Sequence, residues 1–169
     1  MRHYISFLLL WGFVSCAGAA STIDAINSYA YGANFGWMDC VADTNNGAVI
    51  GDFTCSGYIY SANVGWIYLG SGSPANGIQY QNNSASNFGV NNDGFGNLNG
   101  YAWGANIGWI TFEQTYGNPK VNMLTGQLSG YAWSANCGWI SLSNAVAFVQ
   151  TDSLYPARWH RMACRFRGC

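Results

Sequence analysis

The acidic residues are the first candidates for chemistry, because two carboxyl groups suffice for glycoside hydrolysis. One carboxylic acid protonates the leaving oxygen, while the other carboxylate attacks the sugar or activates a water molecule. Glu113 with Asp93 or Asp52 is the candidate pair. These acids stand alone in turn-like sequences, where carboxylates are usually solvated surface groups. We therefore expect no catalytic residues, and a carboxylate-dependent glycoside hydrolase is the weakest of three functional hypotheses.

Metal and cofactor chemistry finds little support in the sequence. Residues 20–152 contain no histidine, which removes His-based triads and most zinc sites. Asp43–Gly47 and Asn91–Gly94 carry oxygen ligands at loop spacing. Neither segment completes the Asp-x-Asp/Asn-x-Asp/Asn-Gly pattern of a calcium loop, and turn formation explains both. The sequence therefore predicts no metal and no cofactor.

Aromatic residues are the other candidates, and they recur in a ten-residue motif. The motif occurs four times, as YAYGANFGWM from Tyr29, YIYSANVGWI from Tyr58, YAWGANIGWI from Tyr101 and YAWSANCGWI from Tyr131. Its three aromatic positions are filled by Tyr29, Tyr58, Tyr101 and Tyr131, then by Tyr31, Tyr60, Trp103 and Trp133, and finally by Trp37, Trp66, Trp109 and Trp139. Repetition of this kind indicates a repeat architecture before it indicates an activity.

These rings suit either a hydrophobic core or a surface that stacks on sugars. Burying one Trp side chain removes about 150–250 Å² from water, which stabilises a fold by roughly 4–6 kcal/mol before entropy. Few Leu and Ile residues are present, so the core is favoured for the last Trp of each repeat. Trp103 and Trp133 remain open between the two roles, because Tyr replaces them in the other repeats. The tentative glycan platform consists of Tyr101, Trp103, Tyr131, Trp133, Asn106 and Asn136.

The motif predicts two strands joined by a tight hairpin. Aromatic and small residues alternate, and the central Gly/Ser-Ala-Asn-x-Gly is turn chemistry. A two-residue loop at Ala105 and Asn106 would place Trp103 opposite Gly108, whereas a four-residue loop ending at Gly108 would shift the register by one position. A second turn is expected at 125–126. Each repeat then has about three short strands.

Four such repeats predict an antiparallel all-β domain over residues 20–152, arranged as a sandwich, a barrel or a solenoid. The segment 70–87 interrupts the spacing between the second and third repeats. It is rich in Gly, Ser and Asn, so we expect a polar surface excursion with one short strand at 78–81.

The cysteines align with hydrophobic positions of other repeats. The aligned residues are Leu69, Phe112 and Leu142 for Cys40, and Leu98 and Leu128 for Cys55. In an exported protein these two core positions favour a disulfide between Cys40 and Cys55, which would contribute roughly 2–4 kcal/mol. Two buried thiols are the alternative. Cys137 fills the variable motif position, so we expect it to be a buried hydrophobic residue.

The N-terminal residues 1–19 have the layout of a secretory signal peptide. Arg2 precedes an apolar run from 5 to 14, and Ala17–Ala19 provides a cleavage site. The run is shorter than the ~20 residues of a membrane span, so no span is expected after cleavage. A loose lipobox at 13–16 offers a minor alternative, in which Cys16 carries a lipid.

Charge is scarce and unevenly distributed. Residues 20–152 contain seven acidic residues and one basic residue, Lys120, so this part of the chain cannot neutralise a row of phosphates and is not expected to bind nucleic acid. The tail 153–169 is atypically basic and does not continue the repeat. It is an interaction tail, a disordered end or the product of a displaced reading frame, and its Cys164 and Cys169 would pair or join His160 on a metal.

The segment 65–151, with GYAWGANIGWI and GYAWSANCGWI, resembles the GYAW-x-x-N-x-GWI repeat of exported bacterial proteins. The resemblance implies a secreted or cell-surface location and a repeat architecture, but no activity. We therefore expect a non-enzymatic structural or adhesive protein of the bacterial cell envelope or extracellular matrix. Its expected partners are extracellular polysaccharide, other copies of the chain or envelope components. A glycan-binding module that uses exposed aromatic residues is the alternative.

Overall fold

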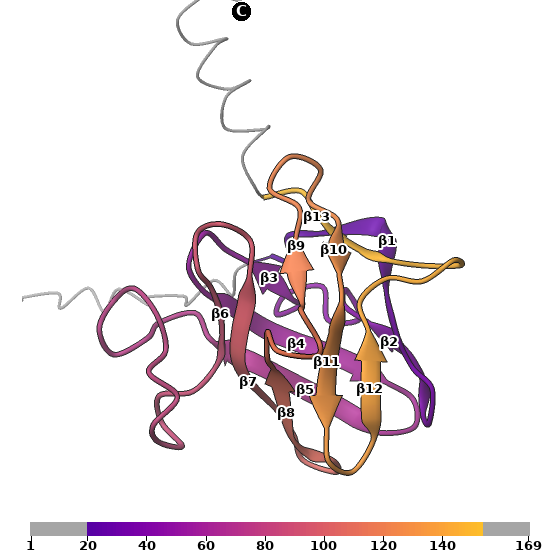
Figure 1. Ribbon diagram of the computed structural model, residues 1–169, viewed down its shortest axis with the longest axis horizontal. Helices are drawn as coiled ribbons and strands as arrows, with labels where there is room; N and C mark the ends of the chain where they lie inside the picture. Colours follow the sequence, from indigo (N-terminus) through magenta and orange to yellow (C-terminus); the bar gives the residue numbers. More distant parts are fainter. Residues whose placement is uncertain (1–19, 154–169) are drawn as a thin grey trace, which may run out of the picture.

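The computed structural model describes residues 20–153, which form antiparallel strands joined by turns (Figure 1). The predicted signal peptide, the lipid site at Cys16 and nearly all of the basic tail, with Cys164 and Cys169, lie outside the described residues. Within 20–153 there is no helix, and hence none that is long and apolar enough to cross a membrane. The prediction of an antiparallel all-β fold is confirmed.

Each of the four motifs forms a β-hairpin. The hairpins are β1 (Ile23–Gly32) with β2 (Gly36–Asp39), β4 (Cys55–Ser61) with β5 (Gly65–Ser71), β7 (Leu98–Gly104) with β8 (Gly108–Phe112), and β11 (Tyr131–Ser134) with β12 (Gly138–Ser141). Each hairpin pairs with the next one along the chain, and β1 closes on β12 through Tyr31 with Ser141 and Gly32 with Ile140. The result is a closed eight-stranded barrel.

Short strands extend the barrel at the end opposite the hairpin turns. These are β3 (Val49–Ile50), β6 (Val90–Asn92), β9 (Lys120–Val121), β10 (Leu128–Ser129) and β13 (Val149–Thr151). In Figure 1, β9, β10 and β13 lie at the top and the hairpin turns at the bottom. The turn predicted at 125–126 joins β9 and β10, with Leu128 opposite Val121.

The strand predicted at 78–81 is absent. Tyr80 of this segment is instead buried, and its hydroxyl donates to the Cys55 carbonyl (3.2 Å) and accepts from the Gly72 N–H (2.5 Å). A buried Tyr that needs a partner for its hydroxyl thus ties the excursion to the barrel. The Tyr80 side chain, and not the expected strand pairing, therefore holds this segment in place.

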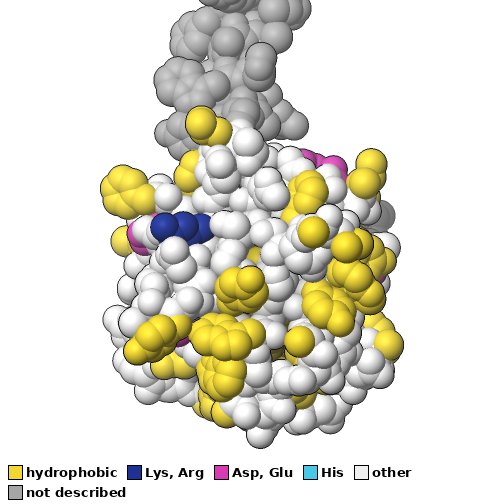
Figure 2. Space-filling model, turned by 45° about the vertical axis from the view of Figure 1, so that its right-hand side comes forward, with side chains coloured by type: hydrophobic (Ala, Val, Ile, Leu, Met, Phe, Trp, Pro, Cys, Tyr) yellow, Lys and Arg dark blue, Asp and Glu magenta, His cyan; other side chains and the backbone are white. Residues whose placement is uncertain are grey.

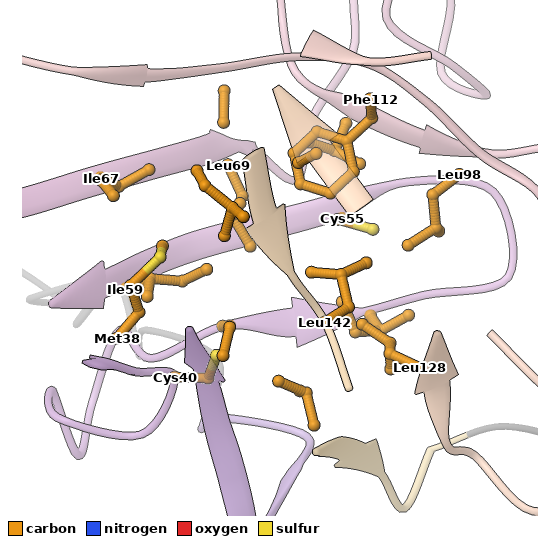
Figure 3. A pocket seen from close by; sticks show the side chains of 18 of the residues that line it. Met38, Cys40, Cys55, Ile59, Ile67, Leu69, Leu98, Phe112, Leu128 and Leu142 are labelled. Carbon is orange, nitrogen blue, oxygen red and sulfur yellow. The ribbon is translucent and has the colours of Figure 1, made fainter. Parts of the chain in front are cut away.

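Small and aliphatic side chains fill the barrel. They alternate along the strands with the aromatic positions, and the innermost are Ala30, Met38, Ile59, Ile67, Ala102, Ile110, Ala132 and Ile140, all buried. Eight strands enclose a space that side chains alone can fill. The remaining cavity measures about 30 Å³ and has an apolar lining (Figure 3). Because one water needs roughly 10–15 Å³ of such space, this cavity has room for about two or three waters at most, and a sugar ring must bind outside it.

The hairpin register follows from how the turn packs. Gly104 lies opposite Gly108, Trp103 opposite Trp109 and Ala102 opposite Ile110, so three residues connect the two glycines. This is the shifted register, and the pairing of Trp103 with Gly108 is wrong. Ile107 turns back over the barrel end, where it is 5% exposed, and a Cβ on Gly104 would lie 2.7 Å from its Cγ1. A large capping residue such as Ile107 therefore requires glycine at the position of Gly104, whereas Ser61 and Ser134 fill this position in the hairpins capped by the smaller Val64 and Cys137.

The same turn explains the variable motif position. Phe35, Val64 and Cys137 occupy the place of Ile107 in the other hairpins, and all three are buried. They cap one end of the core, which requires only an apolar side chain of suitable size. The prediction that Cys137 is a buried hydrophobic residue is confirmed.

Candidate binding surface

Each hairpin carries three aromatic rings on the outer face of the barrel. In the third hairpin, Tyr101 and Trp103 are two residues apart on β7 and therefore share a face, and Trp109 lies opposite Trp103 on β8. The Trp103 and Trp109 ring centroids are 4.7 Å apart at 65°, and those of Tyr101 and Trp109 are 6.0 Å apart at 71°. Such edge-to-face pairs contribute about 0.5–1.5 kcal/mol each beyond their buried area.

The same arrangement occurs in all four hairpins. We define ring cluster 1 as Tyr29, Tyr31 and Trp37, ring cluster 2 as Tyr58, Tyr60 and Trp66, ring cluster 3 as Tyr101, Trp103 and Trp109, and ring cluster 4 as Tyr131, Trp133 and Trp139. In clusters 1, 2 and 4 the first ring lies 6.3, 6.3 and 6.2 Å from the last Trp, and the second ring 4.8, 4.8 and 5.0 Å from it. Tyr and Trp exchange at the second position without changing this geometry.

The last Trp of each cluster is exposed, so its assignment to the core is wrong. Trp37, Trp66, Trp109 and Trp139 are 46, 46, 47 and 41% exposed. Strand alternation in the shifted register places each indole on the outer face, beside the tyrosines, while alanine and the aliphatic residues point inward. On the face shown in Figure 2, hydrophobic side chains gather in separate clusters. The rings therefore form a surface, with their edges packed together and part of each ring open to solvent.

The motif asparagines connect the hairpin turns. The Nδ2 of Asn136 donates to the Ile107 carbonyl (3.0 Å), and that of Asn106 to the Val64 carbonyl (3.1 Å). Asn63 binds the Phe35 carbonyl (2.8 Å) and Asn34 the Cys137 carbonyl (3.0 Å), which closes the circle. We call these four bonds the amide ring. Asn106 and Asn136 were predicted to belong to the glycan platform. Each donates one side-chain N–H to a neighbouring turn.

Open grooves adjoin three of the ring clusters. The linings are Asn82, Asn83, Ser84, Ala85 and Phe88 beside Tyr101 and Trp109, then Glu113 and Tyr116 beside Trp133 and Trp139, and finally Val146 and Ala147 beside Tyr29 and Trp37. In each case the loop that follows one hairpin forms a wall beside the rings of the next. The repeat supplies the rings, and the irregular loops give each groove its own chemistry.

Two further rings join clusters 2 and 3. Tyr68 lies 5.0 Å from Tyr58 and 5.9 Å from Phe88, which in turn lies 4.8 Å from Trp109. Sequence reasoning missed both residues. Tyr68 follows Trp66 by two positions on β5, and this spacing could have revealed it. Phe88 leaves no such signal, because it comes from the irregular segment before β6.

The carboxylates proposed for hydrolysis cap turns. Glu113 accepts hydrogen bonds from the N–H groups of Thr115, Tyr116 and Gly117 at 2.7, 3.0 and 2.7 Å. Desolvation alone would raise the pKa of Glu113, but these hydrogen bonds hold it below its ordinary value. A glycosidase acid needs the opposite shift. The arrangement suits an ionised loop cap.

Asp93 behaves in the same way. Desolvation again opposes the shift, but hydrogen bonds from the Asn97 side chain (2.6 Å) and from the Phe95 and Asn97 N–H groups lower the Asp93 pKa. Asp52 lies in the turn between β3 and β4. The hydrogen bonds of Glu113 and Asp93 therefore favour ionised turn caps over the proton donor that the hydrolase hypothesis requires.

The loops considered for calcium are closed by their own side chains. Asp43 accepts from the N–H groups of Asn45 (2.9 Å) and Asn46 (3.0 Å), and these bonds lower the Asp43 pKa. Asn92 accepts from the Gly94 N–H (3.1 Å). Across the described residues, 20–153, no three His, Cys, Asp or Glu side chains form a group that would hold a metal ion.

Cys40 and Cys55 are free thiols, so the predicted disulfide is wrong. Their exposed fractions are 2% and 0%, and Figure 3 shows them on different sides of the core. The alignment identified two core positions correctly, but a disulfide also needs Cβ atoms about 3.8 Å apart. Burial raises the pKa of each thiol to about 12. Both sulfurs act as core hydrophobic groups.

Comparison with known proteins adds no assignment of function. Protein-family models, curated protein sequences and solved structures all give no match to this chain. The resemblance to exported GYAW-x-x-N-x-GWI proteins therefore stays a prediction. What the protein does must be argued from the ring clusters and the grooves beside them.

Proposed function

We propose that this protein is an exported, non-enzymatic adhesive module of the bacterial cell envelope or extracellular matrix, and that it binds polysaccharide through its ring clusters. One observation carries the proposal: the same three-ring arrangement appears four times on the outside of the barrel, with its last Trp 41–47% exposed. Aromatic rings pack against the apolar C–H faces of sugars, and exposed apolar patches mark binding surfaces. The export component rests on the N-terminal layout and on the repeat resemblance.

The adhesive character follows from how the hairpins succeed one another. They occupy consecutive positions around a closed barrel, so their ring clusters face different sides. Separate sugar chains can then contact separate clusters on one molecule. Several weak sites on one particle give a strong overall attachment when the chains are linked in a matrix. This arrangement fits attachment better than selective capture of one small ligand.

A purely structural role, in which the rings pack against other copies of the chain, is the second candidate. The body also exposes Ile26, Phe95, Leu124 and Val146 at 80–85%, outside the ring clusters. Apolar side chains at this exposure also suit contacts between copies. The two candidates differ in what shields the rings from solvent.

Acrylamide quenching of tryptophan fluorescence tests the proposal. The protein is titrated with a panel of soluble polysaccharides, and the quenching constant is measured at each concentration. We expect the half-exposed indoles to be quenched readily and a particular polysaccharide to protect them. Protection that rises with protein concentration in the absence of polysaccharide would instead support self-association. Quenching that neither polysaccharide nor protein concentration alters would refute both roles for the rings.

A further inference from the structure

The polar segment between β5 and β6 forms one wall of a groove beside ring cluster 3. In Figure 1 this segment makes the loops to the left of β6 and β7. Its polar lining, here called the polar wall, consists of Asn82, Asn83, Ser84 and Ala85, and its aromatic lining of Phe88, Tyr101 and Trp109. Amides and a hydroxyl therefore share one open groove with aromatic rings.

Hydrogen bonds fix the polar wall to the barrel. Asn82 adopts a left-handed backbone (φ 54°), and its Oδ1 accepts from the Gly89 N–H at 3.0 Å. The side chain of the buried Asn91 binds Tyr80 twice, accepting from its N–H (2.8 Å) and donating to its carbonyl (2.9 Å). A further bond, from the Asn87 N–H to the Ser84 carbonyl, closes the turn at the tip. The wall is thus preorganised, which lowers the entropic cost of binding.

The aromatic lining of the groove is a continuous run of rings. Phe88 meets Trp109 edge-on, at 4.8 Å and 88°, and Tyr68 at 5.9 Å and 77°. Tyr101 also packs edge-on against Trp109, at 6.0 Å and 71°. Phe88 thereby extends ring cluster 3 toward ring cluster 2, so this part of the surface is longer than a single hairpin provides.

The exposed polar residues retain hydrogen-bonding capacity. Asn83 donates to the Gln81 Oε1 at 3.2 Å, and Ser84 shares a 3.3 Å bond with Ser86. A side-chain amide has two donors and two acceptor lone pairs, and a hydroxyl has one donor and two lone pairs. Both side chains can therefore bind sugar hydroxyls while keeping these contacts.

We propose that this groove is a binding subsite for a neutral polysaccharide. A sugar ring lies with its C–H face on Trp109 and Tyr101, and its hydroxyls hydrogen-bond to Asn83 and Ser84. The lining residues carry no charge, and the surrounding body, with seven acidic residues and one basic residue between 20 and 152, repels polyanions. The corresponding groove at ring cluster 4 instead contains Glu113. This inference rests on the proposed function and assigns the tightest of its sites for a neutral chain to ring cluster 3.

Calorimetric titration with neutral polysaccharides tests the subsite. Dextran, mannan, galactomannan and xyloglucan are the probes, and dextran sulfate is the charged counterpart of dextran. We expect at least one neutral probe to bind. Failure of all four neutral probes overturns the subsite, and failure of dextran sulfate as well overturns the proposed function. Tighter binding of dextran sulfate than of every neutral probe overturns the claim that the ligand is neutral.

Two variants then separate this groove from the repeat as a whole. Trp109→Ala should weaken binding about tenfold, the scale of a central aromatic contact, whereas Trp139→Ala, which removes the equivalent Trp of ring cluster 4, should leave the affinity within about twofold. Equal losses in both variants would assign binding to the repeated ring clusters, so that the proposed function stands and the subsite fails.

A variant of the polar wall shows whether weaker binding could come from a general loss of folding. Asn83→Ala combined with Ser84→Ala changes only exposed side chains, so the melting temperature should stay unchanged. Its affinity for the same neutral probe should fall at least threefold. Unchanged affinity in this double variant overturns the proposed role of the polar wall and with it the subsite.

Discussion

Removing one bond of the amide ring should destabilise the barrel by a predictable amount. The test substitution is Asn136→Ala, which deletes the hydrogen bond to the Ile107 carbonyl. Asn136 does not have a left-handed backbone, so alanine fits the turn without strain. The effect on stability should therefore come from the lost amide.

The expected magnitude follows from the position of the bond. A neutral hydrogen bond contributes about 0.5–1.5 kcal/mol net. Asn136 is exposed, so water can replace the lost donor, and we expect a loss of about 1 kcal/mol. For a domain of this size, that change lowers the melting temperature by roughly 3 °C. Urea denaturation followed by tryptophan fluorescence measures the free energy directly, as a lower midpoint at constant slope.

A second asparagine tests whether the ring acts bond by bond. Asn63→Ala removes the bond to Phe35 on the opposite side of the barrel. The two substitutions share no partner, so the double variant should lose about 2 kcal/mol, the sum of the single losses. Asn83→Ala is the control, because it removes an exposed amide outside the ring and should change stability by less than about 0.5 kcal/mol.

Two results would refute this reasoning. Unchanged stability in Asn136→Ala would mean that the amide contributes nothing to closing the barrel. Unchanged stability together with weaker polysaccharide binding would restore Asn136 to the ligand platform that the sequence suggested. The measurement therefore separates a role in folding from a role in binding for the same side chain.

Three further predictions follow from the backbone and the buried thiols. Gly126→Ala should lower the free energy of unfolding far more than Gly77→Ala. Both glycines have left-handed backbones (φ 75° and 74°), so the backbone strain is similar. A Cβ at 126 would also collide with the Thr151 carbonyl, whereas the space around 77 is open. Since burial raises the pKa of Cys40 and Cys55 from 9.0 to about 12, their stabilising contribution should be complete below pH 9 and fall above it. The loss should be on the order of 1 kcal/mol per thiol at pH 10, and Cys40→Ala with Cys55→Ala should flatten this pH dependence. Iodoacetamide should modify both cysteines in denaturant but not in the native protein; a disulfide would block modification in both.

Much of the fold could be predicted because the repeat carries several agreeing signals. Alternation, turn residues and the spacing of the four motifs predict the hairpins, and the alignment of Cys40 and Cys55 with leucines identifies core positions correctly. Closure into a barrel could not be predicted, because it depends on the pairing of Tyr31 with Ser141 across the whole chain. A hairpin motif looks the same in a barrel, a sandwich or a solenoid.

The candidate site was harder to predict, because one register position decides which side of the sheet each residue faces. Had Trp103 paired with Gly108, Trp109 would have pointed inward. The structure pairs Trp103 with Trp109 because Ile107 folds over Gly104 to cap the core. The asparagine of the same turn was predicted to bind a ligand, and the sequence did not reveal its hydrogen bond to a neighbouring turn. The register thus depends on packing within one turn, and the asparagine bond depends on the turn of the neighbouring hairpin.

The exposed rings are more than the barrel needs for its stability. Two edge-to-face or tilted ring pairs stabilise each hairpin by about 1–3 kcal/mol, and they leave part of each ring in solvent. Smaller β-branched residues would pair across the same strands and contribute about 0.2–1 kcal/mol per pair, with less apolar surface left in water. Each last Trp nevertheless keeps 41–47% of its surface exposed, on a body with few charges to maintain solubility. Selection for stability alone does not favour this arrangement in four hairpins. A surface that must contact an apolar partner face, such as the C–H face of a sugar, does favour it.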